Sequence, residues 1–163
     1  MKELLIVWHS RTGAANAMAE AAAEAARSES DIATRLTRAA KTQPQDLLAA
    51  AGYLFACPEN LAAMSGEMKE FFDCCYYPCL ERLNGRPYAA LIAAGSDGQG
   101  AARQLARIAT GWRLKPIAEP IIVCTHAQSP EAILAPKRLG EGELTPCRQL
   151  GAAMAAGLAM GVF

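Results

Sequence analysis

Ser10, Thr12 and Gly13 stand together in a turn whose residue types could bind an anion. The apolar block 4–8 precedes this turn, and a stretch of good helix formers follows it over 14–27. Hydroxyl groups and unpaired backbone N–H groups converge at the start of a helix, where the helix dipole adds partial positive charge. The sequence therefore predicts a phosphate at this turn.

Two later segments also have the composition of ligand-binding loops. Pro58 to Met64 follows the apolar block 53–57, and the glycine-rich segment Gly95 to Gly100 follows the apolar block 88–94. The carboxyl ends of neighbouring parallel strands open on one crevice. We therefore expect all three segments to meet at one site.

The elements that must position these loops alternate in type. Strands are predicted over 4–8, 31–37, 53–57, 88–94 and 121–124, with Pro58 ending the third of them. Helices are predicted over 14–27, 44–48, 67–77 (capped by Ser65), 101–110 and 147–160, with one helical turn inside the connection 127–146. This alternation predicts an α/β fold in which a parallel sheet is covered on both faces.

The second strand alternates apolar and polar residues, whereas the first, third and fourth are continuous apolar runs. Only an edge strand has one wet face, so the predicted strand order is 2-1-3-4-5. The expected fold is a three-layer, doubly wound, five-stranded parallel sheet. It forms one domain over residues 1–163.

Composition excludes several classes of protein. Hydrophobic residues make up 52% of the chain, and 16 basic residues balance 16 acidic ones, so no charge excess favours nucleic acid. The six cysteines show no C-x-x-C spacing and no secretory leader is apparent, which favours the cytoplasm. The apolar run 150–163 is shorter than the about 20 residues of a membrane helix, so no membrane insertion is expected. Met154, Leu158 and Val162 make the last helix apolar, which favours a homodimer or higher homo-oligomer.

Other uses of this fold do not match the loops. A phospho-acceptor domain needs acidic residues where the chain has His9-Ser10 and Cys57-Pro58, and no Gly-Lys-Ser/Thr of a Walker loop occurs. The Gly95 segment has the wrong spacing and position for a dinucleotide fingerprint. A Cys-x5-Arg phosphatase loop is also absent. His9 is expected to pack at the end of the first strand and not to act as an acid.

Three stretches resemble one family of flavin proteins. Ser10-x-Thr12-Gly13 resembles the phosphate loop of flavodoxin-like FMN proteins. The stretch Pro58 to Asp73, with Met64-Ser65-Gly66, Met68-Lys69 and Phe71-Phe72-Asp73, is similar to the second flavin loop of NAD(P)H-dependent FMN reductases and quinone reductases. Arg86 to Gly100 is similar to their fourth strand and third loop.

The resemblance implies FMN as cofactor, NAD(P)H as co-substrate and hydride transfer to a quinone-like or other small acceptor. It implies no catalytic side chain and no metal. The cofactor-binding residues it implies are Ser10, Arg11, Thr12, Gly13, Ala14, Ala15, Pro58, Glu59, Asn60, Leu61, Ala63, Met64, Gly95, Ser96, Asp97, Gly98 and Gly100. Tyr76 and Tyr77 are candidates for lining the acceptor pocket.

Two alternatives stay open. One is a flavodoxin-like electron carrier. The other is a flavodoxin-fold binding protein without catalysis, which would fit Ala15 standing where the family often has threonine. The carrier is disfavoured because neither ring-facing loop contains tryptophan or tyrosine and the net charge is zero.

Overall fold

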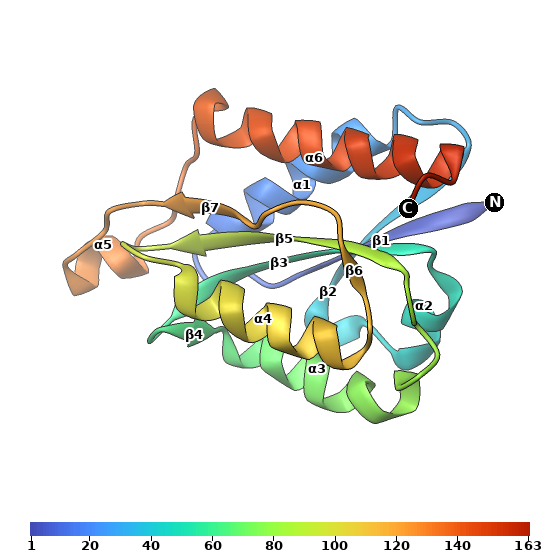
Figure 1. The fold of residues 1–163 in the computed structure, drawn as a ribbon. Helices are drawn as coiled ribbons and strands as arrows, with labels where there is room; N and C mark the ends of the chain where they lie inside the picture. Colours follow the sequence, from blue (N-terminus) through green and yellow to red (C-terminus); the bar gives the residue numbers. More distant parts are fainter.

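A parallel sheet separates two layers of helices in the computed structural model, which describes residues 1–163 (Figure 1). The strands are β1 (Lys2–Trp8), β2 (Ile32–Arg38), β3 (Gly52–Asn60), β4 (Ala63–Met64), β5 (Pro87–Ala94), β6 (Lys115–Pro116) and β7 (Ile121–Cys124). The helices are α1 (Ala14–Ala26), the 3-10 turn η1 (Ala39–Lys41), α2 (Pro44–Ala49), α3 (Gly66–Cys79), α4 (Gln99–Gly111), α5 (Pro130–Leu134) and α6 (Glu141–Met160).

The five longer strands lie in the order β2-β1-β3-β5-β7, and each pairs in parallel with its neighbours. This is the predicted order 2-1-3-4-5, and the α/β prediction is confirmed. Strand β2 is the edge strand, because its half-exposed residues alternate in polarity and tolerate one wet face. The short β6 pairs only with the first residues of β5, at the amino end of that strand.

Two hydrophobic cores fill the space on either side of the sheet. Helices α1 and α6 cover one face, while α2, α3 and α4 cover the other (Figure 1). Small residues let α1 and α6 approach closely, since a Cβ on Gly151 of α6 would lie 2.1 Å from the carbonyl oxygen of Ala22. Met154 and Leu158 are buried in this core, whereas Val162 lies beyond α6 and is exposed.

Two boundaries differ from the predicted ones. Strand β3 continues through Pro58 to Asn60, because its β1 partner ends where Trp8 pairs with Ala56 and the missing N–H of Pro58 costs no hydrogen bond on that side. Helix α6 begins at Glu141, not at residue 147. Its start is stabilised by the Glu143 carboxylate, which accepts a hydrogen bond from the N–H of Gly140 at 2.9 Å.

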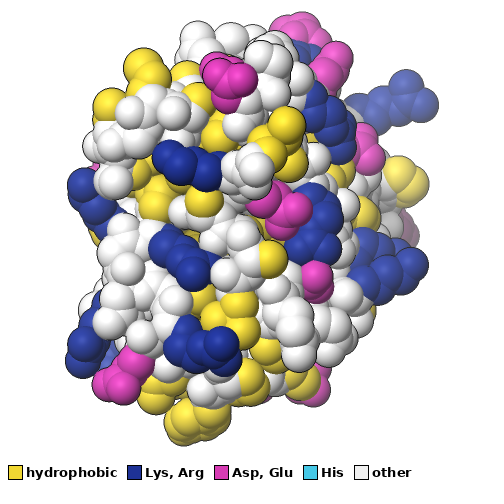
Figure 2. All heavy atoms as spheres, turned by 90° about the vertical axis from the view of Figure 1, so that its right-hand side faces the viewer, with side chains coloured by type: hydrophobic (Ala, Val, Ile, Leu, Met, Phe, Trp, Pro, Cys, Tyr) yellow, Lys and Arg dark blue, Asp and Glu magenta, His cyan; other side chains and the backbone are white.

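The two ends of the sheet differ in character. The carboxyl ends of the strands point toward the loops and α5, while both termini lie at the opposite end (Figure 1). At that opposite end, basic and acidic side chains are interspersed with hydrophobic and neutral atoms (Figure 2). No helix combines the length and the apolar character needed to cross a bilayer.

Candidate functional site

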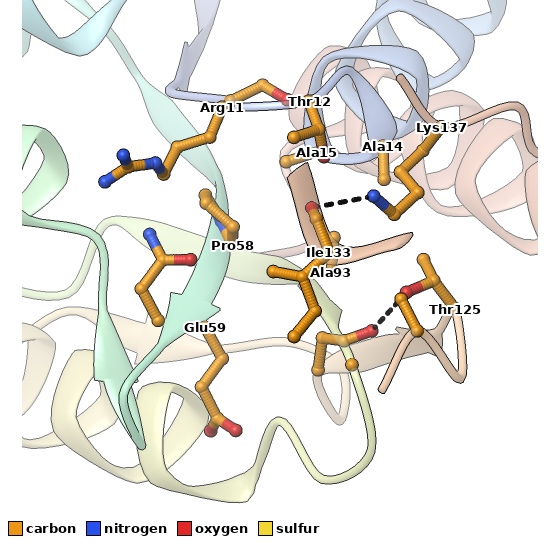
Figure 3. A pocket seen from close by; sticks show the side chains of 15 residues that line it. Arg11, Thr12, Ala14, Ala15, Pro58, Glu59, Ala93, Thr125, Ile133 and Lys137 are labelled. Carbon is orange, nitrogen blue, oxygen red and sulfur yellow. Dashed lines mark hydrogen bonds between the residues drawn. The ribbon is translucent and has the colours of Figure 1, made fainter. Parts of the chain in front are cut away.

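A cleft of about 430 Å³ opens at the carboxyl end of the sheet, where the predicted loops meet (Figure 3). Its walls come from four places, namely the segment that follows β1, the carboxyl end of β3, the carboxyl end of β5 with Gly95, and the segment that follows β7. The lining residues are Ser10, Arg11, Thr12, Ala14, Ala15, Pro58, Glu59, Asn60, Ala93, Ala94, Gly95, Thr125, Ala127, Ile133 and Lys137. None of them is aromatic.

The first loop presents unused hydrogen-bond donors at the start of α1. The Ser10 hydroxyl accepts a hydrogen bond from the N–H of Gly13 at 2.9 Å, which folds the loop on itself. Gly13 adopts φ +106°, a left-handed conformation that favours glycine. The N–H groups of Arg11, Ala14 and Ala15 have no acceptor in the structure. Together with the helix dipole they make a seat for an anion.

The second loop is a hairpin formed by β3 and β4. Asn60 pairs with Ala63, and the two residues at the turn, Leu61 and Ala62, have φ of +52° and +64°. Two consecutive left-handed residues are typical of a type I′ turn, although leucine and alanine adopt it at a cost. Leu61 is fully exposed at the tip. The Nδ2 donor of Asn60, a residue of the cleft wall, is buried without a partner.

Glu59 joins the second loop to the third. Its carboxylate accepts hydrogen bonds from the N–H groups of Gly98 at 2.9 Å and Ala101 at 3.0 Å, at the start of α4. The side chain accordingly points away from Arg11 and Pro58, toward α4 (Figure 3). The N-terminus of α4 therefore already has its anion, whereas that of α1 does not.

A fourth segment, after β7, completes the cleft and was not predicted to do so. The N–H of Lys137 donates to the carbonyl oxygen of Thr12 at 2.7 Å, which ties the segment to the first loop. The Lys137 ammonium donates to the carbonyl oxygens of Ala132, Ile133 and Ala135 at the end of α5. The only signal in the sequence was position, since the carboxyl end of the fifth strand faces the same edge of the sheet.

Burial governs two titratable groups near the cleft, Cys57 and His9. Burial raises the pKa of the Cys57 thiol to about 12, so it is an inert core residue. His9 is 8% exposed and packs at the end of β1, as expected. Burial is also the largest influence on its imidazole and lowers the pKa of His9. Ser65 is the N-cap residue of α3, as predicted, but its hydroxyl lies 2.7 Å from Nδ1 of His9 and makes no capping hydrogen bond to the helix.

The structure brings most, but not all, of the predicted residues to the cleft. Ser10, Arg11, Thr12, Ala14, Ala15, Pro58, Glu59, Asn60 and Gly95 line it. Gly13 shapes the first loop from behind, and Leu61 and Ala63 belong to the hairpin turn. Met64 is buried in the core, where its N–H donates to Oε1 of Gln104 at 2.8 Å.

Two glycines of the third loop, Gly98 and Gly100, make room for protein atoms, whereas Gly95 lines the cleft. A Cβ on Gly98 would lie 2.5 Å from Cγ2 of Ile122, and one on Gly100 would lie 2.1 Å from the carbonyl oxygen of Ala62. Ser96 and Asp97 are exposed and do not line the cleft.

Tyr76 and Tyr77, the candidates for the acceptor pocket, lie away from this cleft. Tyr76 lies about 15 Å along α3 from Gly66, the end of the helix near the cleft. Its ring stacks on Trp112, with centroids 5.8 Å apart, near the amino end of the sheet. Tyr77 is 78% exposed. Neither residue lines the cleft.

A family model described as NADPH-dependent FMN reductase matches residues 36–128, which include the second and third loops and begin after the first. The chain belongs to this family. As a member of the NADPH-dependent FMN reductase family, it is also similar to two curated proteins. It is 32% identical over 100 residues to a flavodoxin from Aquifex aeolicus (strain VF5), which is 61% of this chain and 54% of that protein.

The second is an NAD(P)H dehydrogenase (quinone) from Acidithiobacillus ferrooxidans, 32% identical over 93 residues, 45% of this chain and 46% of that protein. The chain thus spans about half the length of the curated relatives it matches. Among solved structures, a flavodoxin from the domain Archaea and a WrbA-like flavodoxin from Agrobacterium tumefaciens each have a TM-score of 0.74 at 18% identity. The similarity to the archaeal flavodoxin covers 96% of this chain and 98% of that chain. The similarity to the WrbA-like flavodoxin covers 99% of each chain. These likenesses show the flavodoxin-like fold.

Proposed function

We propose that this chain is an FMN-dependent oxidoreductase that takes a hydride from NAD(P)H and passes it to a small acceptor such as a quinone. One observation carries the proposal. In a member of the NADPH-dependent FMN reductase family, the segment after β1 and the carboxyl ends of β3 and β5 line one cleft beside unpaired N–H groups of α1. The names of the two curated relatives agree with a flavin site and with quinone as an acceptor class.

The residues of the cleft fit FMN in their donor chemistry. The phosphate would be bound by the hydroxyls of Ser10 and Thr12 and by the N–H groups of Ala14 and Ala15. The two cations in the lining, Arg11 and Lys137, add positive charge to the same cleft. The buried donor of Asn60, which lacks a partner, would bind an acceptor atom of the ring.

Bound FMN would supply the hydride-accepting chemistry. The protein's contribution is to bind and orient. Glu59 is the carboxylate of the lining and is already bonded to α4, while His9 is buried next to the first loop. Neither side chain is therefore free to act as an acid or base in the cleft, and hydride transfer to a bound flavin would not need one. The absence of aromatic residues from the lining leaves the ring face open to a nicotinamide or a quinone.

A flavodoxin-like electron carrier is the second candidate, favoured by the similarity to the Aquifex aeolicus flavodoxin. A carrier would oxidise NAD(P)H slowly and accumulate a one-electron reduced flavin. The open, non-aromatic cleft argues for the reductase. The cytoplasmic location and the homodimer stay predictions.

Steady-state kinetics of the purified protein with FMN test the proposal. With p-benzoquinone as acceptor, NADPH and NADH oxidation should follow ping-pong kinetics, giving parallel lines in double-reciprocal plots. The variant Thr12→Val should raise the FMN concentration needed for half-maximal rate, whereas Ser28→Ala, an exposed serine at the end of α1, should not. NADPH or NADH oxidation no faster than that with free FMN alone would contradict the proposed enzymatic activity. An FMN-independent melting temperature would favour a binding protein that has lost flavin.

A further inference from the structure

His9 occupies a buried polar junction next to the cleft. It follows β1 and precedes Ser10, the first residue of the cleft wall. Its Nδ1 lies 2.7 Å from the hydroxyl of Ser65, and its Nε2 lies 3.1 Å from the carboxylate of Glu67. Ser65 is 1% exposed, so no substrate reaches its hydroxyl and the group cannot serve as a nucleophile.

The surroundings favour a neutral imidazole at this junction. Three charged groups face it, which are Glu67 on α3, Arg11 in the first loop and Arg38 at the end of β2. Burial and the two guanidinium groups lower the pKa of His9, and the Glu67 carboxylate opposes them. In the neutral form, Nε2–H donates to Glu67 and Nδ1 accepts from the Ser65 hydroxyl, so both ring nitrogens have a partner.

The same junction connects two walls of the cleft. On one side His9 is continuous with Ser10 and the anion seat. On the other side the N–H of Ser65 donates to the carbonyl oxygen of Pro58 at 3.1 Å, and Pro58 lines the cleft. The path from Ser10 through His9 and Ser65 to Pro58 therefore spans the gap between the first and second loops.

We propose that neutral His9 is a positioning residue that sets the spacing between the phosphate-binding and ring-binding walls of this cleft through its bond to Ser65. The proposal rests on the proposed FMN function. Protonation would turn Nδ1 into a donor, and the proton of the buried Ser65 hydroxyl would lose its acceptor. FMN affinity should therefore decrease as the pH is lowered and His9 becomes charged.

The test measures FMN dissociation constants by flavin fluorescence quenching between pH 5 and pH 8 in the full chain. His9→Asn keeps an amide near the position of Nδ1 and can still bond Ser65, whereas His9→Gln places its amide near Nε2. We expect His9→Gln and Ser65→Ala to bind FMN about tenfold more weakly, the effect of one lost hydrogen bond. His9→Asn should restore binding to within about threefold of wild type.

The pH profile separates positioning from general support of the fold. The FMN phosphate itself titrates with a pKa of about 6, so every variant shares that component. Wild type should show an additional loss of affinity in acid that His9→Asn lacks. Glu67→Gln should shift this loss to lower pH, because the opposing carboxylate is gone. Ser28→Ala and Glu119→Gln, both exposed, serve as matched controls.

Each outcome decides the proposal. Near-wild-type affinity and an unchanged pH profile in His9→Gln and Ser65→Ala would overturn the positioning role while leaving the FMN function intact. If wild type itself does not bind FMN, both proposals fail. Should His9→Gln fold poorly, His9→Asn and Glu67→Gln decide the question, since an unaltered acid limb in both would contradict the role of His9.

Discussion

The carboxylate of Glu59 accepts a hydrogen bond at 2.9 Å from the backbone N–H of Gly98, across the gap between the second and third loops. A second bond from the N–H of Ala101 makes the contact two-pronged at the start of α4. Glu59 is part of the cleft wall, but its charged group does not face the cleft, because both carboxylate oxygens face α4. This contact holds the second loop against the helix that follows the third.

Replacing Glu59 with glutamine tests this contact. The amide nitrogen of Glu59→Gln would face a backbone N–H, so one of the two bonds is lost and two donors oppose each other. We expect about 1–3 kcal/mol of destabilisation and weaker FMN binding. Urea unfolding and flavin titration measure the two effects. Glu119→Gln, at an exposed position, should change neither. Unchanged stability in Glu59→Gln would show that the contact is not formed in solution.

Gly13 should tolerate no side chain at the start of α1. Its φ of +106° is unfavourable for alanine, so Gly13→Ala should cost about 1–2 kcal/mol and disturb the anion seat. The matched control is Gly142→Ala, at an open position in α6, which should leave stability unchanged or raise it by up to about 1 kcal/mol. Thermal unfolding compares the two. Equal effects would mean that the first loop does not require the left-handed conformation.

Lys137 should support the cleft through α5 and the first loop. The variant Lys137→Met removes three hydrogen bonds to the carbonyl oxygens of α5 and one positive charge from the lining. We expect FMN binding to weaken by about threefold to tenfold. Lys115→Met, at the exposed amino end of the sheet, is the control. Loss of affinity in both variants would indicate a general effect of net charge, which raised ionic strength would also abolish.

Asp46 should make the stability of the fold depend on pH in the acid range. Burial alone would raise the pKa of Asp46, but the N–H of Gln43 and the Arg35 guanidinium outweigh it and lower the pKa below its ordinary value of 3.8. The unfolded chain then binds more protons than the folded one in this range, so stability is present above pH 3.8 and is lost as pH falls. Between pH 5 and pH 3 the urea midpoint should drop more for wild type than for Asp46→Asn. The same pH dependence of the urea midpoint in wild type and Asp46→Asn would contradict a lowered pKa of Asp46.

The sequence was sufficient for the strand order and for the meeting of three loops. These follow from local patterns, namely continuous apolar strands, an amphipathic edge strand and helix starts, combined with the general topology of doubly wound sheets. The buried position of His9 was also predicted. Its partners Ser65 and Glu67 were not, since their contact joins segments 56 and 58 residues apart and leaves no local signal.

Other features depended on long-range packing. Pro58 was expected to end a strand, but β3 continues because its β1 side is unpaired there. Gly98 and Gly100 were expected to accommodate a ligand, yet Ile122 and Ala62 occupy the space. Lys137 joins the cleft only because its backbone bonds to Thr12, far away in the sequence. Tyr76 was matched to a substrate region by resemblance, but Trp112 binds its ring elsewhere.

The central claim is that the first loop binds the phosphate of FMN. The most direct measurement is a comparison of dissociation constants for FMN and riboflavin, which share the ring and differ in the phosphate. Hydrogen bonds from the free N–H groups to a charged phosphate should make FMN bind at least about tenfold more tightly. Equal affinity for the two, or no quenching of either, would contradict the account.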